Sequence, residues 1–198
     1  FNSCRSLGEI NFPEGIILIG ESCFVGCSSL NSVSLPDSLQ SLGDGAFQSC
    51  TKLTNFHLGS GLEALQTTMF DVSPLLAEFT VSLQNQHFSE IDGVLFNKNK
   101  STLILYPAGR EGTYEIPSST NSLAPSAFSS AVNLTSVTIP EGITEITEQC
   151  FYYCTNLESV QLPSSLRTIG EYSFSNCLSL SGIKIPSGVI SINASAFN

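Results

Sequence analysis

The apolar positions of this chain recur with a period of 23 residues. Phenylalanine marks the period most clearly, in two groups whose neighbours lie 23 residues apart. Proline keeps the same spacing and follows a short run of apolar residues separated by polar ones. Periods of this length are typical of solenoids, in which every repeat forms one coil. The phased phenylalanines are Phe1, Phe24, Phe47, Phe70, Phe128, Phe151, Phe174 and Phe197, and the prolines are Pro13, Pro36, Pro117, Pro140, Pro163 and Pro186.

Each repeat predicts one short strand and one tight turn. In one repeat Leu30, Val33 and Leu35 are separated by polar residues and end at Pro36. A strand with one buried face has this pattern, and proline ends it because proline has no N–H to donate to a sheet ladder. The turn comes from an aromatic residue and a cysteine three residues apart, a spacing that fits one helical or 3₁₀ turn. The strand is of the leucine-rich-repeat type.

Coils of this kind bury their apolar residues only by stacking on one another in parallel register. We therefore expect a leucine-rich-repeat solenoid, a right-handed curved array of 23-residue coils. A parallel β-sheet should line the concave face, with short helical or 3₁₀ turns and short strands on the convex face. The phased phenylalanines should form a continuous column in the core, and neighbouring coils should spread apart on the convex side.

One coil is longer than the others. The 58 residues from Phe70 to Phe128 equal two repeats plus 12 residues, and this insertion falls within 83–116. The β-rich runs 92–96 and 102–106 predict a hairpin joined by residues 97–101, in place of the helical turn. We expect residues 1–198 to form a single domain of about eight coils. The hairpin region carries Lys98, Lys100 and Arg110, which indicate either a solvated turn or, less simply, a binding feature.

The charge balance narrows the classes of partner. Seven Lys and Arg residues stand against 17 Asp and Glu residues, which gives a net charge of −10. Nucleic-acid phosphates and anionic lipids would be repelled, so we expect neither nucleic acid nor direct membrane insertion. No apolar stretch approaches the ~20 residues of a membrane helix. A targeting signal or membrane anchor is expected outside this sequence.

The cysteines follow the repeat rather than a metal or disulfide pattern. Five of the seven share one phase, which Ser73 and Ala131 occupy in other coils. A position shared by Cys, Ser and Ala is typical of a small buried site, where a free thiol packs as a small apolar group. We expect structural thiols, no metal site and no cofactor. The five cysteines are Cys4, Cys27, Cys50, Cys154 and Cys177.

No catalytic constellation is evident. The chain lacks the G-x-S-x-G, P-loop, G-x-G-x-x-G and H-E-x-x-H motifs, and neither His57 nor His87 lies near a recognisable nucleophile. We therefore expect no enzyme activity. An enzyme would require a pocket with a perturbed pair of titratable groups, for which His57 or the acidic residues near the hairpin are the places to look.

The outward positions of the predicted strands form the candidate binding surface. They are small and polar and almost free of aromatic residues, which favours a broad, hydrogen-bonding surface over a tight single-partner interface. The alternative is that these positions are polar only because they face water. The candidate residues are Asn31, Ser34, Asn55, His57, Glu78, Thr80, Ser136, Thr138, Glu158, Gln161 and Lys184.

Three Asn-x-Ser/Thr triplets, at Asn99, Asn133 and Asn193, are candidate N-glycosylation sites. They permit a secreted or cell-surface location.

The repeat unit resembles that of BspA-like leucine-rich-repeat proteins, which are surface proteins of anaerobic bacteria and trichomonad parasites. Residues 140–186 carry the clearest match, and Asp92–Phe96 with Leu103–Pro107 resembles the hairpin-bearing coil of that class. The resemblance implies an adhesion module that binds a protein or glycan on host cells or extracellular matrix, without catalysis. The sequence opens and closes within a repeat, so we expect a fragment of a longer array. The alternative is a structural module that self-assembles through its uncapped ends.

Overall fold

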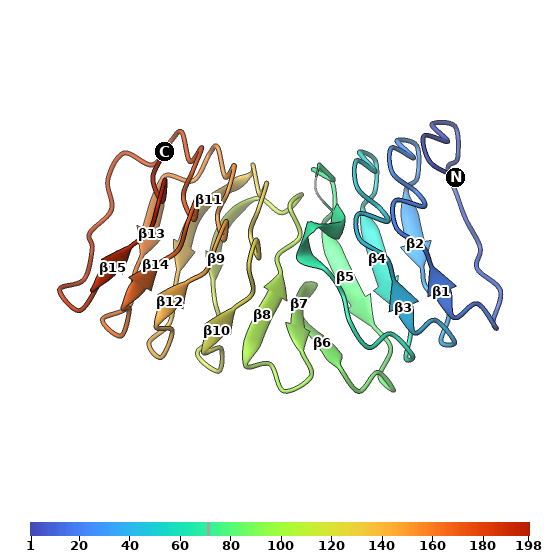
Figure 1. Ribbon diagram of the computed structural model, residues 1–198, viewed down its shortest axis with the longest axis horizontal. Coiled ribbons are helices and arrows are strands. Elements are labelled where there is room, and N and C mark those ends of the chain that lie inside the picture. The colour runs from blue at the N-terminus through green and yellow to red at the C-terminus, as the bar shows by residue number, and fades with distance from the viewer. Residues whose placement is uncertain (71) are drawn as a thin grey trace. The chain divides into compact units, whose positions relative to one another are not determined.

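The computed structural model describes residues 1–70 and 72–198, apart from the Met69 side chain, and divides into two compact units (Figure 1). Unit 1 comprises residues 1–99 and unit 2 residues 100–198. Each unit is a parallel β-solenoid with almost no helix, and paired strand residues such as Ser32 and Asn55 lie one repeat apart. The predicted leucine-rich-repeat solenoid with coils of 23 residues is therefore confirmed.

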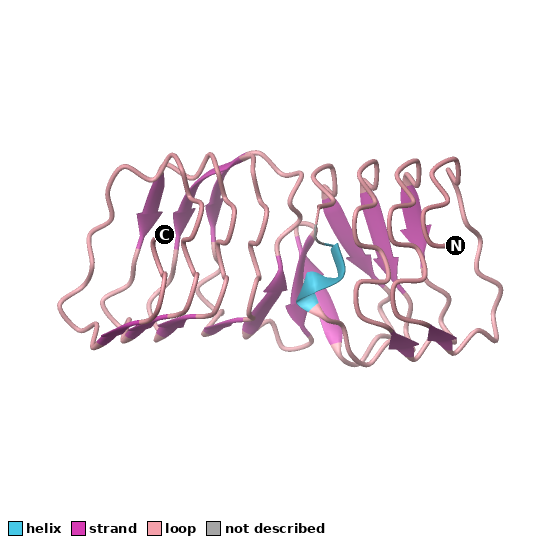
Figure 2. Cartoon of the chain, turned by 45° about the horizontal axis from the view of Figure 1, so that its top comes forward, coloured by secondary structure: helices cyan, strands magenta, loops and turns pink. Residues whose placement is uncertain are grey.

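In unit 1 the coils contribute strands to two sheets. The strands of the apolar run that ends each repeat form a parallel sheet, which we call the long-strand sheet: β2 (Ser32–Ser34), β4 (Asn55–Leu58) and β5 (Glu78–Val81). Pro36 follows the first of these strands, whereas Gly59 and Ser82 take the proline position after the other two. The apolar residues before the turn form the short-strand sheet, with β1 (Leu18–Ile19) paired to β3 (Ser41–Leu42). Figure 2 shows the strands in magenta, with loops and turns between them.

Unit 2 repeats this arrangement. Its long-strand sheet consists of β9 (Gly112–Glu115), β11 (Leu134–Thr138) and β13 (Ser159–Gln161), with a register shift between Leu134 and Ser136. Its short strands are β8 (Thr102–Leu105) with β10 (Ser122–Leu123), and β12 (Glu145–Ile146), β14 (Thr168–Ile169) and β15 (Ser191–Ile192). Residues 180–186, where the pattern predicts a further long strand, form none.

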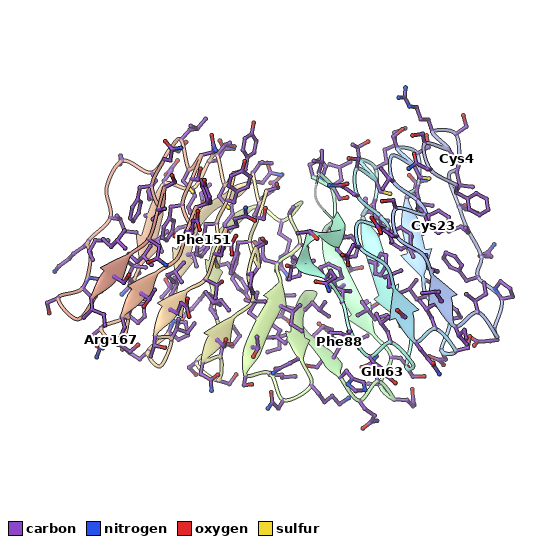
Figure 3. The ribbon with its side chains drawn as sticks, in the orientation of Figure 1. Cys4, Cys23, Glu63, Phe88, Phe151 and Arg167 are labelled. Carbon is purple, nitrogen blue, oxygen red and sulfur yellow. The ribbon has the colours of Figure 1, made fainter. Side chains whose placement is uncertain are left out.

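The phased phenylalanines form stacks in the core. In unit 1 the rings of Phe1, Phe24 and Phe47 are nearly parallel, with centroids 5.2 Å apart. In unit 2 Phe151, labelled in Figure 3, lies between two such rings, at 4.8 and 5.2 Å. Tyr106 extends that stack by one ring, 5.0 Å from the next. The complete unit 2 stack is Tyr106, Phe128, Phe151, Phe174 and Phe197.

The expected continuous column is wrong for the last coils of unit 1. Phe70 packs edge-on against Phe56 and Phe79, with ring centroids 4.7 and 5.3 Å away. Phe56 and Phe79 lie on β4 and β5 at the strand position that holds Val33 in the preceding coil. Because a phenylalanine ring fills far more of the core than valine, the phased ring takes an edge-to-face arrangement instead of a parallel stack.

We call the stretch from three residues before to three residues after each phased phenylalanine the turn side. Successive i to i+3 hydrogen bonds build it, such as Cys27 N–H to the Phe24 carbonyl at 3.2 Å. Within the described residues, η1 (Thr67–Phe70) is the one 3₁₀ helix, so most of the expected helical turns are irregular turns instead.

Residues in the left-handed region explain these irregular turns. Positive φ values between 52° and 69° recur at two positions of the repeat. The first position lies two residues before the phased phenylalanine, and the second lies two residues after it. Left-handed residues end a helix, because L-amino acids do not propagate in that conformation. The positions before are Ser22, Gly45, Ser126, Gln149, Tyr172 and Ser195, and those after are Ser3, Gly26, Ser49, Val72, Ser130, Tyr153 and Asn176.

The turn sides of neighbouring coils are hydrogen-bonded to one another. The N–H groups of Gln149, Phe151 and Tyr153 donate to carbonyls of the next coil at 2.8–2.9 Å. Ser22 and Phe24 donate in the same way in unit 1, at 3.0 and 2.8 Å. The expectation that coils spread apart on this side is therefore wrong, because the left-handed residues turn every second N–H toward the neighbouring coil.

The phased cysteines have a role beyond packing. The Cys50 thiol donates to the Phe24 carbonyl of the preceding coil at 3.4 Å, and the Cys154 thiol donates to the Phe128 carbonyl at 3.1 Å. Burial raises the pKa of Cys50 to about 12, so the thiol keeps the proton that it donates. These thiols are free, and each gives its carbonyl a second hydrogen bond beside the one from the N–H group of its own turn.

The insertion in unit 1 contains an antiparallel hairpin of β6 (Phe88–Ile91) and β7 (Val94–Asn97). Asp92 and Gly93 connect the strands with φ values of 49° and 76°, as the Asp-Gly pair favours in a two-residue turn. The predicted run 102–106 contains β8, but the run 92–96 is displaced, because Asp92 and Gly93 form the turn and β7 extends to Asn97, which the prediction placed in the connection. The pairing of β7 with β8 stays a prediction.

Asn85 fastens this hairpin to the preceding coil. The side chain is fully buried, donates to the Gly59 and Leu62 carbonyls at 2.8 and 3.1 Å, and accepts from the N–H groups of His87 and Phe88 at 2.8 Å. All four side-chain hydrogen-bonding positions are thus used to join the two coils.

Candidate functional site

The outer face of the unit 1 long-strand sheet carries two polar rows. Parallel register brings Asn55 beside Glu78 and His57 beside Thr80, and both pairs are hydrogen-bonded. The His57 Nδ1 and Thr80 Oγ1 atoms are 2.8 Å apart. Ser34 continues the second row on β2. These candidate residues alternate with buried apolar residues along each strand, which places their side chains together on the solvent face.

Unit 2 carries the corresponding rows on β9, β11 and β13. Ser136 lies beside Ser159, with hydroxyl oxygens 2.8 Å apart, and Thr138 lies beside Gln161. Direct hydroxyl bonds between neighbouring strands use part of the hydrogen-bonding capacity of each row. The rest remains directed at solvent, because a hydroxyl offers one donor and two acceptor positions.

A shallow hollow of about 540 Å³ lies on the unit 2 face. Strand β13 is at the edge of its sheet, and the segment with Lys184 borders the hollow beside it. Four candidate residues therefore meet at one place, although Lys184 comes from a segment that forms no strand. The lining is Ser136, Thr138, Ser159, Val160, Gln161, Leu162, Ser164, Lys184 and Pro186.

A second hollow, of about 330 Å³, lies on the unit 1 face. The candidates Ser34 and His57 line it, together with Asn11 and two carboxylates, Glu14 and Asp37. The two hollows differ in charge, since the lining in unit 1 is acidic whereas that in unit 2 contains a lysine and no acidic residue.

The carboxylates in the unit 1 hollow are held by the backbone. Glu14 accepts hydrogen bonds from the N–H groups of Asp37 and Ser38 at 3.1 and 3.0 Å, and Asp37 accepts from the Ser60 N–H at 2.6 Å. The bond from the Ser60 backbone lowers the pKa of Asp37 below its usual 3.8. Both acids therefore join successive coils, and the lowered pKa favours the ionised form of Asp37.

The same device recurs in unit 2. Glu141 accepts from the backbone N–H groups of Ser164 and Ser165 at 2.9 and 3.1 Å, and the Ser164 backbone lowers its pKa below the usual 4.5. In both units the acid follows the repeat proline. The geometry indicates a structural role for these acids rather than proton transfer.

Three candidate residues lie beside the strands rather than on them. Asn31 directly precedes β2 and its carbonyl accepts from the Thr54 N–H at 2.8 Å, Glu158 directly precedes β13, and Lys184 lies at the hollow. Their side chains are exposed. The strand pattern predicts which face they share but not where each strand begins.

Sequence reasoning missed two residues of the polar rows. Thr113 and Glu115 on β9 lie beside Ser136 and Thr138. Their coil lacks the Leu-x-x-Val spacing because it contains the insertion. The alternation from Thr113 to Ile116, followed by the phased Pro117, is the signal that identifies this strand.

His87 and the glycosylation candidates lie away from these faces. His87 is at the base of the hairpin, where its N–H donates to Asn85. Asn99 and Asn193 are exposed and Asn133 is half-buried, and their modification stays a prediction. Among residues 1–70 and 72–198, no three His, Cys, Asp or Glu side chains gather as metal ligands would. In the same residues no helix has the length and apolar character to span a membrane.

Comparison with known protein families decides the class of the chain. The profile of the BspA type leucine-rich-repeat region matches residues 1–108 and 112–198, in six copies. The chain belongs to this family. Proteins with this type of repeat are typically non-catalytic. A search of curated protein sequences gives no match.

The fold of this chain is similar to that of several solved structures. A leucine-rich cell surface protein of Faecalibacterium prausnitzii is 28% identical, with a TM-score of 0.81 over 99% of this chain and 53% of that one. The pneumococcal vaccine antigen PcpA is 27% identical, with a TM-score of 0.76 over 89% of this chain and 50% of that one. The leucine-rich-repeat protein of T. pallidum is 25% identical, with a TM-score of 0.54 over 85% and 74%. The chain thus spans about half the length of the first two proteins.

Proposed function

We propose that this chain is a non-enzymatic binding module of a cell-surface or secreted protein. Its ligand is a protein or glycan of a host cell or of the extracellular matrix, bound by the outer faces of the long-strand sheets. The observation that carries the proposal is the convergence of candidate residues from two strands and a separate segment on the hollow in unit 2. Membership of the BspA-type family and likeness to a cell surface protein support the location.

The chemistry of the surface favours contact over a broad area. Its residues are hydroxyls, amides and single charges, and hot-spot residues such as Trp and Arg are lacking from the candidate rows. Affinity would therefore come from many hydrogen bonds across several coils, and the bound protein or glycan would need matching polar groups. An acidic chain of this kind selects against anionic membranes and nucleic acids.

The test is binding of the labelled chain to epithelial cells and to a panel of matrix proteins. The variant Ser136→Glu with Ser159→Glu places two charges in the hollow, and Thr168→Glu with Ser191→Glu places the same charges on the short-strand sheet. Saturable binding that the first variant loses and the second keeps is expected. Equal binding by both variants, or no binding by the unaltered chain, contradicts the proposal. Light scattering of the same samples tests self-association, which a purely monomeric chain at high concentration would contradict.

A further inference from the structure

The turn sides of the two units differ in their aromatic residues. Unit 2 contains all five tyrosines of the chain. Three of them, Tyr152, Tyr153 and Tyr172, lie on the turn sides of two neighbouring coils. Tyr153 is 49% exposed, and its ring centroid is 6.1 Å from that of Tyr152. Tyr152 and Tyr172 are partly exposed.

Two of these tyrosines occupy positions that disfavour a large side chain. Tyr153 and Tyr172 have φ values of 61° and 53°, at the recurring left-handed positions that most other coils fill with Ser, Gly or Asn. A non-glycine residue in this region costs about 1–2 kcal/mol. Tyr153 recovers little of this cost by burial, since half of it remains in water. A residue that breaks a local rule without a structural gain is typical of a functional position.

Two glutamates share this surface. Glu148 and Glu171 are exposed and lie in the same two coils, where the Gln149 N–H donates to the Glu171 carbonyl at 2.9 Å. Glu171 directly precedes Tyr172, and Tyr152 N–H closes the turn on the Gln149 carbonyl at 3.0 Å. We call Glu148, Tyr152, Tyr153, Glu171 and Tyr172 the tyrosine surface. Exposed or partly exposed tyrosines are thus found together with carboxylates on the turn sides of the same two coils, in a chain whose net charge is −10.

We propose that the tyrosine surface binds an arginine-bearing basic segment of a partner protein. The guanidinium group stacks on the face of a tyrosine ring and pairs with a carboxylate, and both contacts suit arginine better than lysine. Tyrosines on an otherwise polar face are the residues that anchor protein partners. The chain makes one such contact internally, where the Arg110 guanidinium lies 5.9 Å from the centroid of the Tyr106 ring. This site is separate from the long-strand sheets proposed above.

Unit 1 supplies a matched control within the same chain. Glu21 and Asp44 occupy the repeat positions of Glu148 and Glu171 and are also exposed. Their neighbouring left-handed residues are Ser22, Gly26 and Gly45 rather than tyrosines. A ligand that responds only to negative charge would bind both places, whereas one that needs the rings would bind unit 2.

The test uses short peptides that alternate glycine with arginine, lysine or citrulline, titrated into the full chain by calorimetry. Saturable binding of the arginine peptide is expected, with weaker binding of the lysine peptide and none of the citrulline peptide. Tyr153→Ser with Tyr172→Ser should lower the affinity by about tenfold or more. Glu148→Gln with Glu171→Gln should lower it similarly, and Glu21→Gln with Asp44→Asn should leave it nearly unchanged.

Three results would overturn the proposal. These are an unchanged affinity in the double tyrosine variant, an equal loss in the Glu21 and Asp44 variant, and the lack of saturable binding of the arginine peptide by the unaltered chain. The tyrosine variants replace left-handed residues with one that other coils already use there, so they are expected to fold. A urea midpoint no lower than that of the unaltered chain checks this.

Discussion

Removal of one ring from the unit 2 stack measures how much the stack contributes to stability. Phe151 is fully buried between two rings, whereas Phe197 is 43% exposed and contacts one ring of the stack. Phe→Ala in a packed core costs about 3–5 kcal/mol, so Phe151→Ala should fall in this range. Phe197→Ala loses about half of the buried area and one stacking partner, and should cost about 1–2 kcal/mol.

Tyrosine fluorescence during urea unfolding is a specific assay for this pair. The chain has no tryptophan and all its tyrosines lie in unit 2, so the signal follows the unit that contains both substitutions. The free energy of unfolding comes from linear extrapolation, with comparable urea slopes required of all three proteins. A loss below about 1 kcal/mol for Phe151→Ala, or equal losses at both positions, would refute the stacked-core account.

Four further perturbations test individual contacts. Asn85→Ala leaves four backbone groups of unit 1 without this partner, three of them in buried hydrogen bonds, and should cost about 3 kcal/mol or more in the free energy of unfolding. Urea unfolding followed by circular dichroism measures this loss, and a loss near zero contradicts the fastening role. Ser73 occupies the phased cysteine position, where its side chain is buried and its hydroxyl has no hydrogen-bond partner. Ser73→Cys should therefore raise the free energy of unfolding by about 0.5–1 kcal/mol in the same assay. An unchanged value would argue against a stabilising role of the thiol hydrogen bonds. Tyr153→Gly removes the strain of a tyrosine at positive φ and should stabilise unit 2 by about 1 kcal/mol in the fluorescence assay. A lower free energy of unfolding would instead show that the tyrosine ring packs favourably. Folding lowers the pKa of Glu141, so its contribution to the stability of unit 2 is complete above pH 4.5 and is lost as the pH falls through the lower pKa of the folded state. The free energy of unfolding from the fluorescence assay should therefore decrease on acidification, and Glu141→Gln should make this decrease smaller.

The sequence predicts the features that depend on one coil and its repetition. The 23-residue spacing gives the register of neighbouring strands, and alternation along a strand gives the shared face of Asn55 and His57. The edge-on packing of Phe70 could not be predicted in this way, because it depends on the bulk of two rings from other strands. The role of Asn85 is hidden for the same reason, since the carbonyls that it binds belong to the preceding coil.

The left-handed positions of the turn side illustrate a different limit of prediction from sequence. They hold Ser, Gly, Gln, Val, Asn and Tyr, so no single residue type identifies them. Backbone hydrogen bonds between coils fix the conformation, and the side chain is left to vary. The repeat pattern therefore does not single out Tyr153, because its positive φ and its exposure are properties of the folded coil.

The hydrogen bonds of the turn side also bear on how each unit responds to a pulling force. The bonds to the adjacent coil come from three turn-side N–H groups in coils such as that of Phe151, from cysteine thiols and from the acids that follow the prolines. None of them reaches beyond that coil. A terminal coil pulled away from the stack loads these bonds a few at a time, while the next coil keeps its own set. Each coil that detaches would release about 80 Å of extended chain. A stack in which each coil is bonded only to its nearest neighbours thus lengthens in steps under tension.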